Sequence, residues 1–542
     1  MRLSGAAVAL AGTAWLTGCT SRAGQVQPAP DDTRPPDVEL ALRATSGEVA
    51  LLPGTPTRVQ RFQGEVLSGD ASTLQPLSDS YLGPIIRVQR GQRVRVHFTN
   101  DIDAETIVHW HGLHVPADMD GHPRFVIASG ETFTYEFTVQ NRAGTYWFHP
   151  HPHGQTGPQV YAGLAGLFLV SDVEEAALTL PAGEADIPLI IQDRTFDSDN
   201  KLVYLPSGMM DQMMGMLGER ILVNGQPDYV LPVATRAYRL RLLNGSNSRI
   251  YRLAWEDNTP LTVIAGDGGL LAQPVQRDFV MLAPGERVEL WADFRDRTVG
   301  EELRLRSLPI DGIEMDGGMM GGMMDGMMDG GHGGMMDDEQ RGGMPGSGMQ
   351  PPNQALPNGA EFSILTVRVE EEVQDTTTLP QQLSDPGFLA PANAVNQNAP
   401  RSFTASMGHM EWLLNRRTFE MEAVAEDETV QLGTTEIWEF INQEDPGGMM
   451  NMMGMAHPIH VHGLQFQIIE RTPPTNATLK ANWEAVRMGF VDEGWKDTFL
   501  LMPGERVKIL LRFADYDGLY LYHCHNLEHE DGGMMRNYRV HT

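Results

Sequence analysis

The sequence predicts an all-β protein built from three tandem β-sandwich domains. A segment that alternates in the manner of a strand and ends at Asn occurs three times, at 93–100 (RVRVHFTN), 238–244 (YRLRLLN) and 436–442 (EIWEFIN). After each of them, a Gly-Glu turn leads into another alternating strand, at 127–139, 282–294 and 501–513. Repeats of this size are domains rather than solenoid units, and short strands with Gly and Pro turns are typical of sandwiches.

The domain limits follow from these repeats. We expect domains at 37–175, 176–372 and 373–542. A chain of 542 residues is too long for one hydrophobic core, which also favours about three domains. Residues 315–349, rich in Met and Gly, lie between two strand-like runs and cannot bury a core. They should form a mobile insertion in the second domain.

The N-terminus predicts export. Residues 1–19 combine one early Arg, a short apolar run and small residues, as secretory signals do. Leu16-Thr17-Gly18-Cys19 resembles a lipobox, in which cleavage leaves a lipidated cysteine. Residues 20–36 are polar and Pro-rich, as a flexible tether would be. We expect a periplasmic or cell-surface protein with a lipid anchor at Cys19. The alternative is an ordinary signal peptide with a chance cysteine.

Charge and cysteine content narrow the function. A net charge of −31 argues against nucleic acid and against an anionic membrane surface as partners. The chain has two cysteines, so once Cys19 is removed or acylated Cys524 is the remaining thiol and no intramolecular disulfide can form. An exported cysteine flanked by histidines is better explained as a metal ligand or a nucleophile.

Most of the seventeen histidines fall into four clusters in the first and third domains. These are His109 and His111; His149, His151 and His153; His457, His460 and His462; and His523, His525 and His529. Residues two apart in a strand point to the same face, so each His-x-His pair can aim two imidazoles at one place. The middle domain has none apart from His332 in the Met-rich segment, so the metal chemistry should lie between the first and third domains. Five others have no such partners and are expected to be solvated or isolated core residues rather than metal ligands: His97, His114, His122, His409 and His541.

Cys524 lies between the members of the last pair and must point to the opposite face of its strand. His529 and Met534 follow on a predicted loop that can curl back to the cysteine, and His457 can add a second imidazole. Two His, one thiolate and a weak axial Met form the blue-copper ligand set. Eight paired histidines remain, enough for a three-copper cluster, whereas zinc is disfavoured by one thiolate among so many imidazoles.

The motifs HWHG (109–112), WFHPHPHG (147–154), HPIHVHG (457–463) and HCHNLEHEDGGMM (523–535) make the sequence similar to the three-domain multicopper oxidases, which include laccases and bacterial copper-efflux oxidases. The resemblance spans essentially the whole mature chain and implies cupredoxin-like Greek-key sandwiches that hold four copper ions. It assigns type 1 copper to His457, Cys524, His529 and Met534, and type 2 copper to His109 and His460. It assigns the type 3 pair to His111, His149 and His525 on one ion and His151, His462 and His523 on the other. His153 would lie beside these ligands.

The resemblance also implies a mechanism. A reductant gives one electron at a time to type 1 copper, Cys524 passes it on, and the three-copper cluster reduces dioxygen to water. Asp120 and Glu530 match the acids that supply protons there.

Most of the 31 methionines lie in three stretches, at 209–216, 315–349 and 449–455. Thioethers select Cu(I), so we expect the segment 315–349 to capture copper, the alternative being a degenerate linker. For 209–216 the alternative is a short helix with apolar packing, because its Met pairs recur four residues apart. By the same resemblance, Met455, and with it Met453, is a candidate ligand for substrate copper.

We therefore expect a monomeric cuprous oxidase in copper tolerance, with dioxygen as acceptor and laccase-type side activity. One alternative is a laccase for phenolic or other organic reductants, in which the Met-rich segments are incidental. A copper-sequestering protein is an alternative of another class. A nitrite reductase of related architecture normally has two such domains per chain and lacks the cluster ligands.

Overall fold

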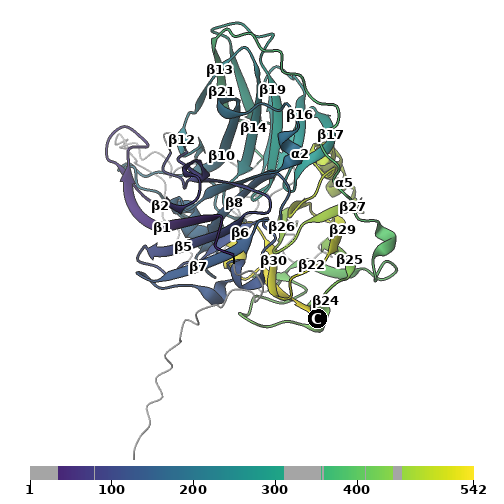
Figure 1. Ribbon diagram of the computed structural model, residues 1–542. Coiled ribbons are helices and arrows are strands. Elements are labelled where there is room, and N and C mark those ends of the chain that lie inside the picture. The colour runs from purple at the N-terminus through teal and green to yellow at the C-terminus, as the bar shows by residue number, and fades with distance from the viewer. Residues whose placement is uncertain (1–33, 78–79, 311–355, 357–358, 409–410, 444–453) are drawn as a thin grey trace, which may run out of the picture. The chain divides into compact units, whose positions relative to one another are not determined.

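Three consecutive pairs of β-sheets form the framework of the chain in the computed structural model (Figure 1). The structure describes residues 34–77, 80–310, 356, 359–408, 411–443 and 454–542. Arg34–Thr542 forms one unit by contacts. The described part of the chain is dominated by strands, so the prediction of an all-β fold with three sandwiches is confirmed.

The first pair has the strand orders β2-β1-β5-β7 and β3-β4-β9-β8-β6. Its strands are β1 (Val38–Val49), β2 (Thr57–Ser68), β3 (Leu74–Gln75), β4 (Ile85–Gln89), β5 (Arg93–Asp101), β6 (Val108–His111), β7 (Thr132–Thr138), β8 (Gly144–Pro150) and β9 (Gly166–Ser171).

The second pair has the orders β12-β11-β10-β14-β19-β16-β17 and β13-β21-β20-β15-β18. Its strands are β10 (Asp186–Arg194), β11 (Arg220–Val223), β12 (Gln226–Pro227), β13 (Val230–Ala234), β14 (Ala237–Asn244), β15 (Tyr251–Trp255), β16 (Leu261–Gly266), β17 (Gly269–Arg277), β18 (Val280–Leu282), β19 (Arg287–Asp293), β20 (Glu302–Ser307) and β21 (Phe362–Glu371).

The third pair has the orders β23-β22-β25-β29-β27 and β24-β31-β30-β26-β28. Its strands are β22 (Arg401–Gly408), β23 (Glu411–Leu414), β24 (Thr429–Gln431), β25 (Thr435–Asn442), β26 (His457–Val461), β27 (Phe466–Thr472), β28 (Thr498–Leu501), β29 (Arg506–Arg512), β30 (Gly518–Cys524) and β31 (Met535–His541).

The predicted repeats occupy equivalent places in the three domains. The strands β5, β14 and β25 each pair in parallel with the first strand of their sheet, namely β1, β10 and β22. On the other side they pair antiparallel with the strands that follow the Gly-Glu turns, namely β7, β19 and β29. The three repeats therefore form the same three-stranded unit.

The histidine motifs lie on the second sheets of the first and third domains. In the antiparallel pair β6 and β8, His109 is directly opposite His149. In the pair β26 and β30, His460 is opposite His523 and Ile459 is opposite Cys524. Because side chains alternate between the faces of a strand, this register puts the cysteine on the other face from its neighbours.

The described residues also form seven short 3-10 helices and the short α-helices α1 (Thr156–Ala162), α2 (Val173–Ala176), α3 (Met209–Met214), α5 (Ala477–Val486) and α6 (Leu527–Asp531). The short helix predicted as one possibility for 209–216 is therefore present as α3. His529 was expected on a loop but lies on α6, because the Asn526 side chain caps the N-terminus of this helix and accepts a hydrogen bond from the His529 amide.

Several expectations concern residues outside those described: the signal, Cys19 and most of the tether, the segment 315–349, His409, and Met453. The strands that flank 315–349 are β20 and β21, which pair antiparallel. The strands of the three domains span 38–171, 186–371 and 401–541, and the domain limits between them stay predictions.

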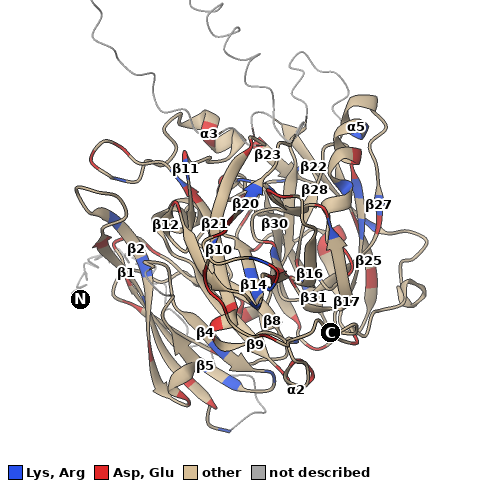
Figure 2. Cartoon of the chain, turned by 90° about the horizontal axis from the view of Figure 1, so that it is seen from above, with Lys and Arg blue, Asp and Glu red and all other residues tan. Residues whose placement is uncertain are grey.

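Among the described residues, no helix has the length and apolar character needed to cross a membrane. Basic residues are scattered over separate elements, such as β1, β5 and β27, with acidic residues between them (Figure 2).

Candidate metal centre

A cysteine–imidazole site lies in the core of the third domain. The Cys524 sulfur is 3.5 Å from Nδ1 of His457 and 3.7 Å from Nδ1 of His529. These three side chains and that of Met534 are buried. Met534 packs in the same apolar cluster as Cys524, and its carbonyl accepts a hydrogen bond of 3.0 Å from the Cys524 amide. The chain thus folds back at 524–534 and brings the four predicted type 1 ligands together.

The other eight predicted ligands lie together between the first and third domains. We call them the histidine cluster: His109, His111, His149, His151, His460, His462, His523 and His525. All eight are buried. Their strands, β6 and β8 on one side and β26 and β30 on the other, lie side by side in Figure 1.

Ring contacts run throughout the cluster, both within the groups that the family resemblance implies and between them: the rings of His109 and His462 stack at 3.8 Å and those of His111 and His460 at 3.7 Å. His151, His462 and His523 have ligand nitrogens within 4.8 Å of one another. The rings of His111, His149 and His525 are separated by centroid distances of 4.9 to 5.6 Å. The remaining two, His109 and His460, have their Nε2 atoms 3.3 Å apart.

Backbone carbonyls and the carboxyl group of Asp120 accept hydrogen bonds from four of these rings and so set their tautomers. Nδ1 of His109 donates to the Asp120 carbonyl at 2.6 Å, and Nδ1 of His460 donates to the Asp497 carbonyl at 2.8 Å. Each ring therefore has a bare Nε2, and the two bare atoms face each other. His462 and His523 repeat this arrangement. Nδ1 of His462 donates to Asp120 Oδ2, Nδ1 of His523 donates to the Cys524 carbonyl, and the two Nε2 atoms are 3.0 Å apart.

Two facing lone pairs at this distance need a cation between them. Protonation could supply one, but burial lowers the pKa of every ring in the cluster, that of His523 to about 4 and that of His149 to about 3. A metal ion satisfies the nitrogens without protonation, and metal-binding histidines typically donate their other N–H to a carbonyl or carboxylate. The donor set fits metal ions.

The Cys524 thiol, in the core of the third domain, also fits a metal ion. Burial raises the pKa of Cys524, so a thiolate there requires a cation. A thiolate, two imidazoles and a thioether suit copper better than zinc.

Two buried carboxyl groups flank the cluster at the predicted positions. Asp120 Oδ2 accepts a hydrogen bond of 2.7 Å from His462 Nδ1. The Glu530 oxygens lie 3.4 Å from His151 Nε2 and 3.2 Å from His523 Nδ1. Burial raises the pKa of both carboxyl groups well above the usual range, which favours a neutral acid beside the cluster.

The sequence missed four residues that contact these sites. Asp497 accepts a hydrogen bond of 3.1 Å from His111 Nε2, and Arg287 forms an ion pair with Asp497. At the other site, the Met213 carbonyl accepts hydrogen bonds of 2.9 Å from both His529 Nε2 and Trp412 Nε1. Asp497 and Met213, the two acceptors, lie outside the histidine motifs. Arg287 lies in the repeated Gly-Glu turn, which is the one sequence signal that points to it.

The structure differs from expectation for His153, which was expected beside the ligands. Its side chain is exposed and packs on Phe419 at a ring-centroid distance of 4.8 Å, because the chain turns away from the cluster after His151. Met455 is buried in the same apolar cluster as Cys524.

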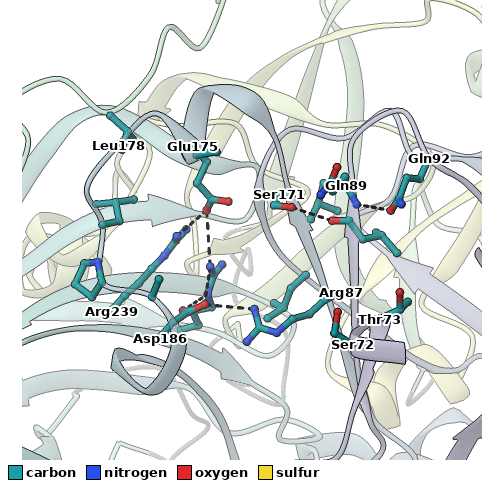
Figure 3. Close-up of a pocket in the computed structure, with 18 of the residues that line it drawn as sticks. Ser72, Thr73, Arg87, Gln89, Gln92, Ser171, Glu175, Leu178, Asp186 and Arg239 are labelled. Carbon is teal, nitrogen blue, oxygen red and sulfur yellow. Dashed lines mark hydrogen bonds and ion pairs between the residues drawn. The ribbon is translucent and has the colours of Figure 1, made fainter. Parts of the chain in front are cut away.

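A cavity of about 430 Å³ lies elsewhere, lined by residues of the first two domains (Figure 3). Its cations are paired with acids, Arg239 with Glu175 at 2.6 Å and Arg87 with Asp186 at 3.4 Å. None of its described lining residues is His or Cys, so the cavity resembles a polar domain junction rather than a redox site.

Comparison with known proteins identifies the family of the chain. Residues 58–175 and 393–542 match two family models that are both described as multicopper oxidase. The chain is 29% identical to a multicopper oxidase of Staphylococcus haemolyticus, over 89% of this chain and 87% of the relative. It is 30% identical to a laccase of Bacillus stratosphericus, over 84% and 88%.

Among solved structures, McoA multicopper oxidase from Aquifex aeolicus superposes with a TM-score of 0.73 at 32% identity, covering 94% of this chain and 97% of that one. The fold is thus the three-domain, cupredoxin-like one that the resemblance implies. The chain belongs to the multicopper oxidase family, and it is a copper-dependent oxidoreductase with dioxygen as its electron acceptor.

Proposed function

We propose that the protein is a cuprous oxidase that removes toxic Cu(I) by oxidising it, with laccase-type activity toward phenols as a secondary reaction. The reaction balances as four Cu(I) giving four electrons, which with four protons reduce one O₂ to two H₂O. Copper tolerance is the corresponding role.

We further propose four resident copper ions. Type 1 copper would be held by His457, Cys524, His529 and Met534, and type 2 copper by His109 and His460. The type 3 pair would be held by His111, His149 and His525 and by His151, His462 and His523. When bound, these ions would supply one-electron transfer at the first site and dioxygen reduction at the cluster.

The chain's own residues link the two sites. Cys524 is joined by peptide bonds to both His523 and His525, so an electron that reaches its sulfur has a short covalent route to the cluster. Asp120 and Glu530 are carboxyl groups in contact with cluster rings, which suits them to hold and release the protons that the reaction consumes.

One observation carries the choice of Cu(I): the Met-rich helix α3 lies against His529, a ligand of the proposed type 1 site. Helix α3 packs against α6, and the Met213 carbonyl holds His529 Nε2. The helix also presents Met209, which is 70% exposed, while Met214 packs against the cluster that contains Cys524. Soft thioethers at this position favour a Cu(I) ion over an aromatic ring as the reductant.

The test compares two substrates in one variant. Replacing Met209, Met210 and Met214 by Leu keeps the volume and helix propensity but removes the thioethers. We expect kcat/KM for Cu(I) to fall about tenfold or more while kcat/KM for a phenol changes less than twofold. Met488→Leu, another exposed methionine at 58% exposure, is the matched control. Equal loss with both substrates would favour a laccase, and copper binding without oxygen uptake would favour a sequestering protein.

Three further variants extend this test: deletion of 315–349, Met455→Leu and Met453→Leu. Met453 lies outside the described residues. The deletion should slow Cu(I) oxidation only at low Cu(I), where capture limits the rate. Met455→Leu should lower the Cu(I) rate even with that segment intact, because Met455 lies two residues before His457.

For localisation we propose export and a lipid anchor at Cys19, as the N-terminal pattern predicts. Cys19→Ala should release soluble enzyme or leave an uncleaved precursor. Native protein that is soluble, lipid-free and cleaved elsewhere would overturn the anchor. We also propose that the protein is a monomer. The sedimentation coefficient of the mature chain in the absence of detergent would test this.

A further inference from the structure

We propose that Arg287, in the middle domain, is a positioning residue for the histidine cluster. Through Asp497 it holds His111 in the tautomer that leaves Nδ1 bare, and it fixes the carbonyl that orients His460. The domain without histidine ligands would then control copper binding at a site between the other two. This inference rests on the ligand set proposed above.

The turn that carries Arg287 lies directly against the cluster. It has the sequence Pro-Gly-Glu-Arg (284–287), and Gly285 has a φ of +84°. A Cβ on Gly285 would come within 3.0 Å of His525 Cδ2 and 3.1 Å of His111 Cε1. The backbone of the middle domain therefore packs on two cluster rings, and only glycine fits there without displacing them.

All donors of the Arg287 guanidinium are used, and their acceptors come from all three domains. Nε donates to the Thr145 carbonyl of the first domain at 3.0 Å. Nη1 donates to Asp497 Oδ1 of the third domain at 2.6 Å, and Nη2 to the other oxygen of the same carboxylate. The two remaining donors bind the Gly285 and Asp267 carbonyls of the middle domain. A bidentate Arg–carboxylate pair with no exposed side chain fixes the orientation of Asp497.

Asp497 in turn sets the tautomer of His111. As a carboxylate paired with Arg287 it can only accept, so His111 Nε2, 3.1 Å away, must carry the proton. His111 Nδ1 then has a free lone pair and, among the described residues, makes no hydrogen bond in its buried position. The Thr498 hydroxyl, 3.0 Å from His111 Nε2, could donate or accept and would not fix the tautomer alone.

The same residue also orients a second ring. The Asp497 carbonyl accepts from His460 Nδ1 at 2.8 Å, which leaves His460 Nε2 bare. Side chain and backbone of one residue thus direct two rings, one in each of two predicted copper groups. A rotation of Asp497 would disturb both.

A second buried ion pair holds this segment against the middle domain. Lys496 Nζ lies 2.9 Å from Asp267 and 3.1 Å from Glu286. The Asp267 carboxylate thus binds Lys496 and the Arg287 backbone amide and lies 3.6 Å from Arg287 Nη1, whereas both oxygens of Asp497 accept hydrogen bonds from the guanidinium.

The repeated turn shows that this arrangement is specific to the middle domain. The third domain has the same Pro-Gly-Glu-Arg sequence at 503–506, but the Arg506 side chain is 49% exposed and pairs with Glu439. The side chains of Arg287 and Asp497 are both fully buried. One motif therefore forms a surface ion pair in one domain and a contact to the cluster in the other.

The test measures copper in the holoenzyme by electron paramagnetic resonance and by competition with a chelator. In Arg287→Gln we expect type 2 copper to bind about ten- to a hundredfold more weakly, the range typical when a hydrogen-bond partner of a metal ligand is removed. The type 1 signal and blue colour should stay unchanged. Asp497→Asn should act similarly, because its amide can donate to His111 Nε2 and permit the wrong tautomer. Arg287→Lys should rescue only partly, since Lys lacks the fork that binds both oxygens.

Arg241→Gln is the matched control. Arg241 is also buried in the middle domain, binds acids in the same way and contacts Thr145, but none of its partners among the described residues is a cluster histidine. We expect this variant to keep the type 2 signal even where its melting temperature falls.

Normal type 2 copper affinity in both Arg287→Gln and Asp497→Asn would overturn the inference, as would parallel loss of type 1 and type 2 copper in Arg287→Gln and Arg241→Gln. If Arg287→Gln does not fold, Asp497→Asn decides alone. A wild-type protein without any type 2 signal would instead contradict the proposed ligand set.

Discussion

Cys524 Sγ lies 3.5 Å from Nδ1 of His457, on the face of β30 opposite to that of its neighbours His523 and His525. One strand thus serves two sites. We expect Cys524→Ser to abolish the blue colour and all substrate oxidation, because serine cannot supply the soft thiolate. Copper analysis should still find the cluster ions, whose eight rings are unchanged. A blue and active variant would contradict the assignment.

Met534 and Met535 are adjacent but lie in different environments. Met534 packs in the cluster that contains Cys524, whereas Met535 packs with Phe419 and Leu521. We expect Met534→Leu to raise the type 1 reduction potential, because it removes a weak electron-donating axial ligand. A redox titration of the blue absorbance measures this. Met535→Leu is the matched control, and a shift in that variant alone would reverse the assignment.

The sequence alone predicts the local part of this arrangement. Strand alternation is local, so the His-x-His pairs and the opposite orientation of Cys524 follow from the spacing. The repeats also predict the central strands β5, β14 and β25 correctly, although only β5 alternates between buried and more open side chains, whereas the side chains of β14 are all buried and those of β25 nearly all. Spacing alone does not divide eight histidines among copper ions. That division came from the family resemblance.

Contacts between domains could not be predicted. Asp497 lies in EGWKDTF, where nothing distinguishes it from an ordinary buried acid, and its partner Arg287 is 210 residues away in the chain. Met213 meets His529 through its backbone carbonyl, which no side-chain pattern reports. His153 continues the His-x-His spacing, but the strand ends at Pro150, so the alternation no longer applies.

Trp412 covers the type 1 histidines. It is 8% exposed, and its ring lies 4.7 Å from the ring of His457 and 5.0 Å from that of His529. We expect Trp412→Ala to raise kcat/KM for phenols several-fold, because an aromatic substrate could then approach the two rings, and to leave Cu(I) oxidation equal or lower. Trp412→Phe, which keeps a ring, should remain close to wild type. A parallel fall with both substrates in Trp412→Ala would mean that the residue only supports the core.

The pH dependence of stability should depend in part on His122. Burial lowers the pKa of His122 to about 4, although its Nε2 donates to Asn537 at 2.8 Å. Its Nδ1 accepts from the Arg124 amide at 3.1 Å, so protonation would break that bond. The unfolded chain binds a proton at this residue near pH 6.5, well before the folded chain does, so stability is lost as the pH falls from about 6.5 toward 4.

Between pH 7 and pH 5 we expect His122 to account for about 2 kcal/mol of the loss in unfolding free energy. Denaturant unfolding of the metal-free protein at both pH values, compared with His122→Gln, measures this share. The variant should be less stable at pH 7 but should lose less stability on acidification. An unchanged pH slope would contradict the assignment of the shift to His122.

The most direct test of the central claim is the ratio of Cu(I) consumed to O₂ consumed by the fully copper-loaded enzyme. A cuprous oxidase that reduces dioxygen completely at the cluster must use four Cu(I) for each O₂ and release no hydrogen peroxide. We predict this ratio of four, at a rate far above that of Cu(I) in buffer alone. A ratio of two with accumulating peroxide would contradict four-electron reduction at the cluster. Oxygen uptake with phenols but not with Cu(I) would contradict Cu(I) as the substrate.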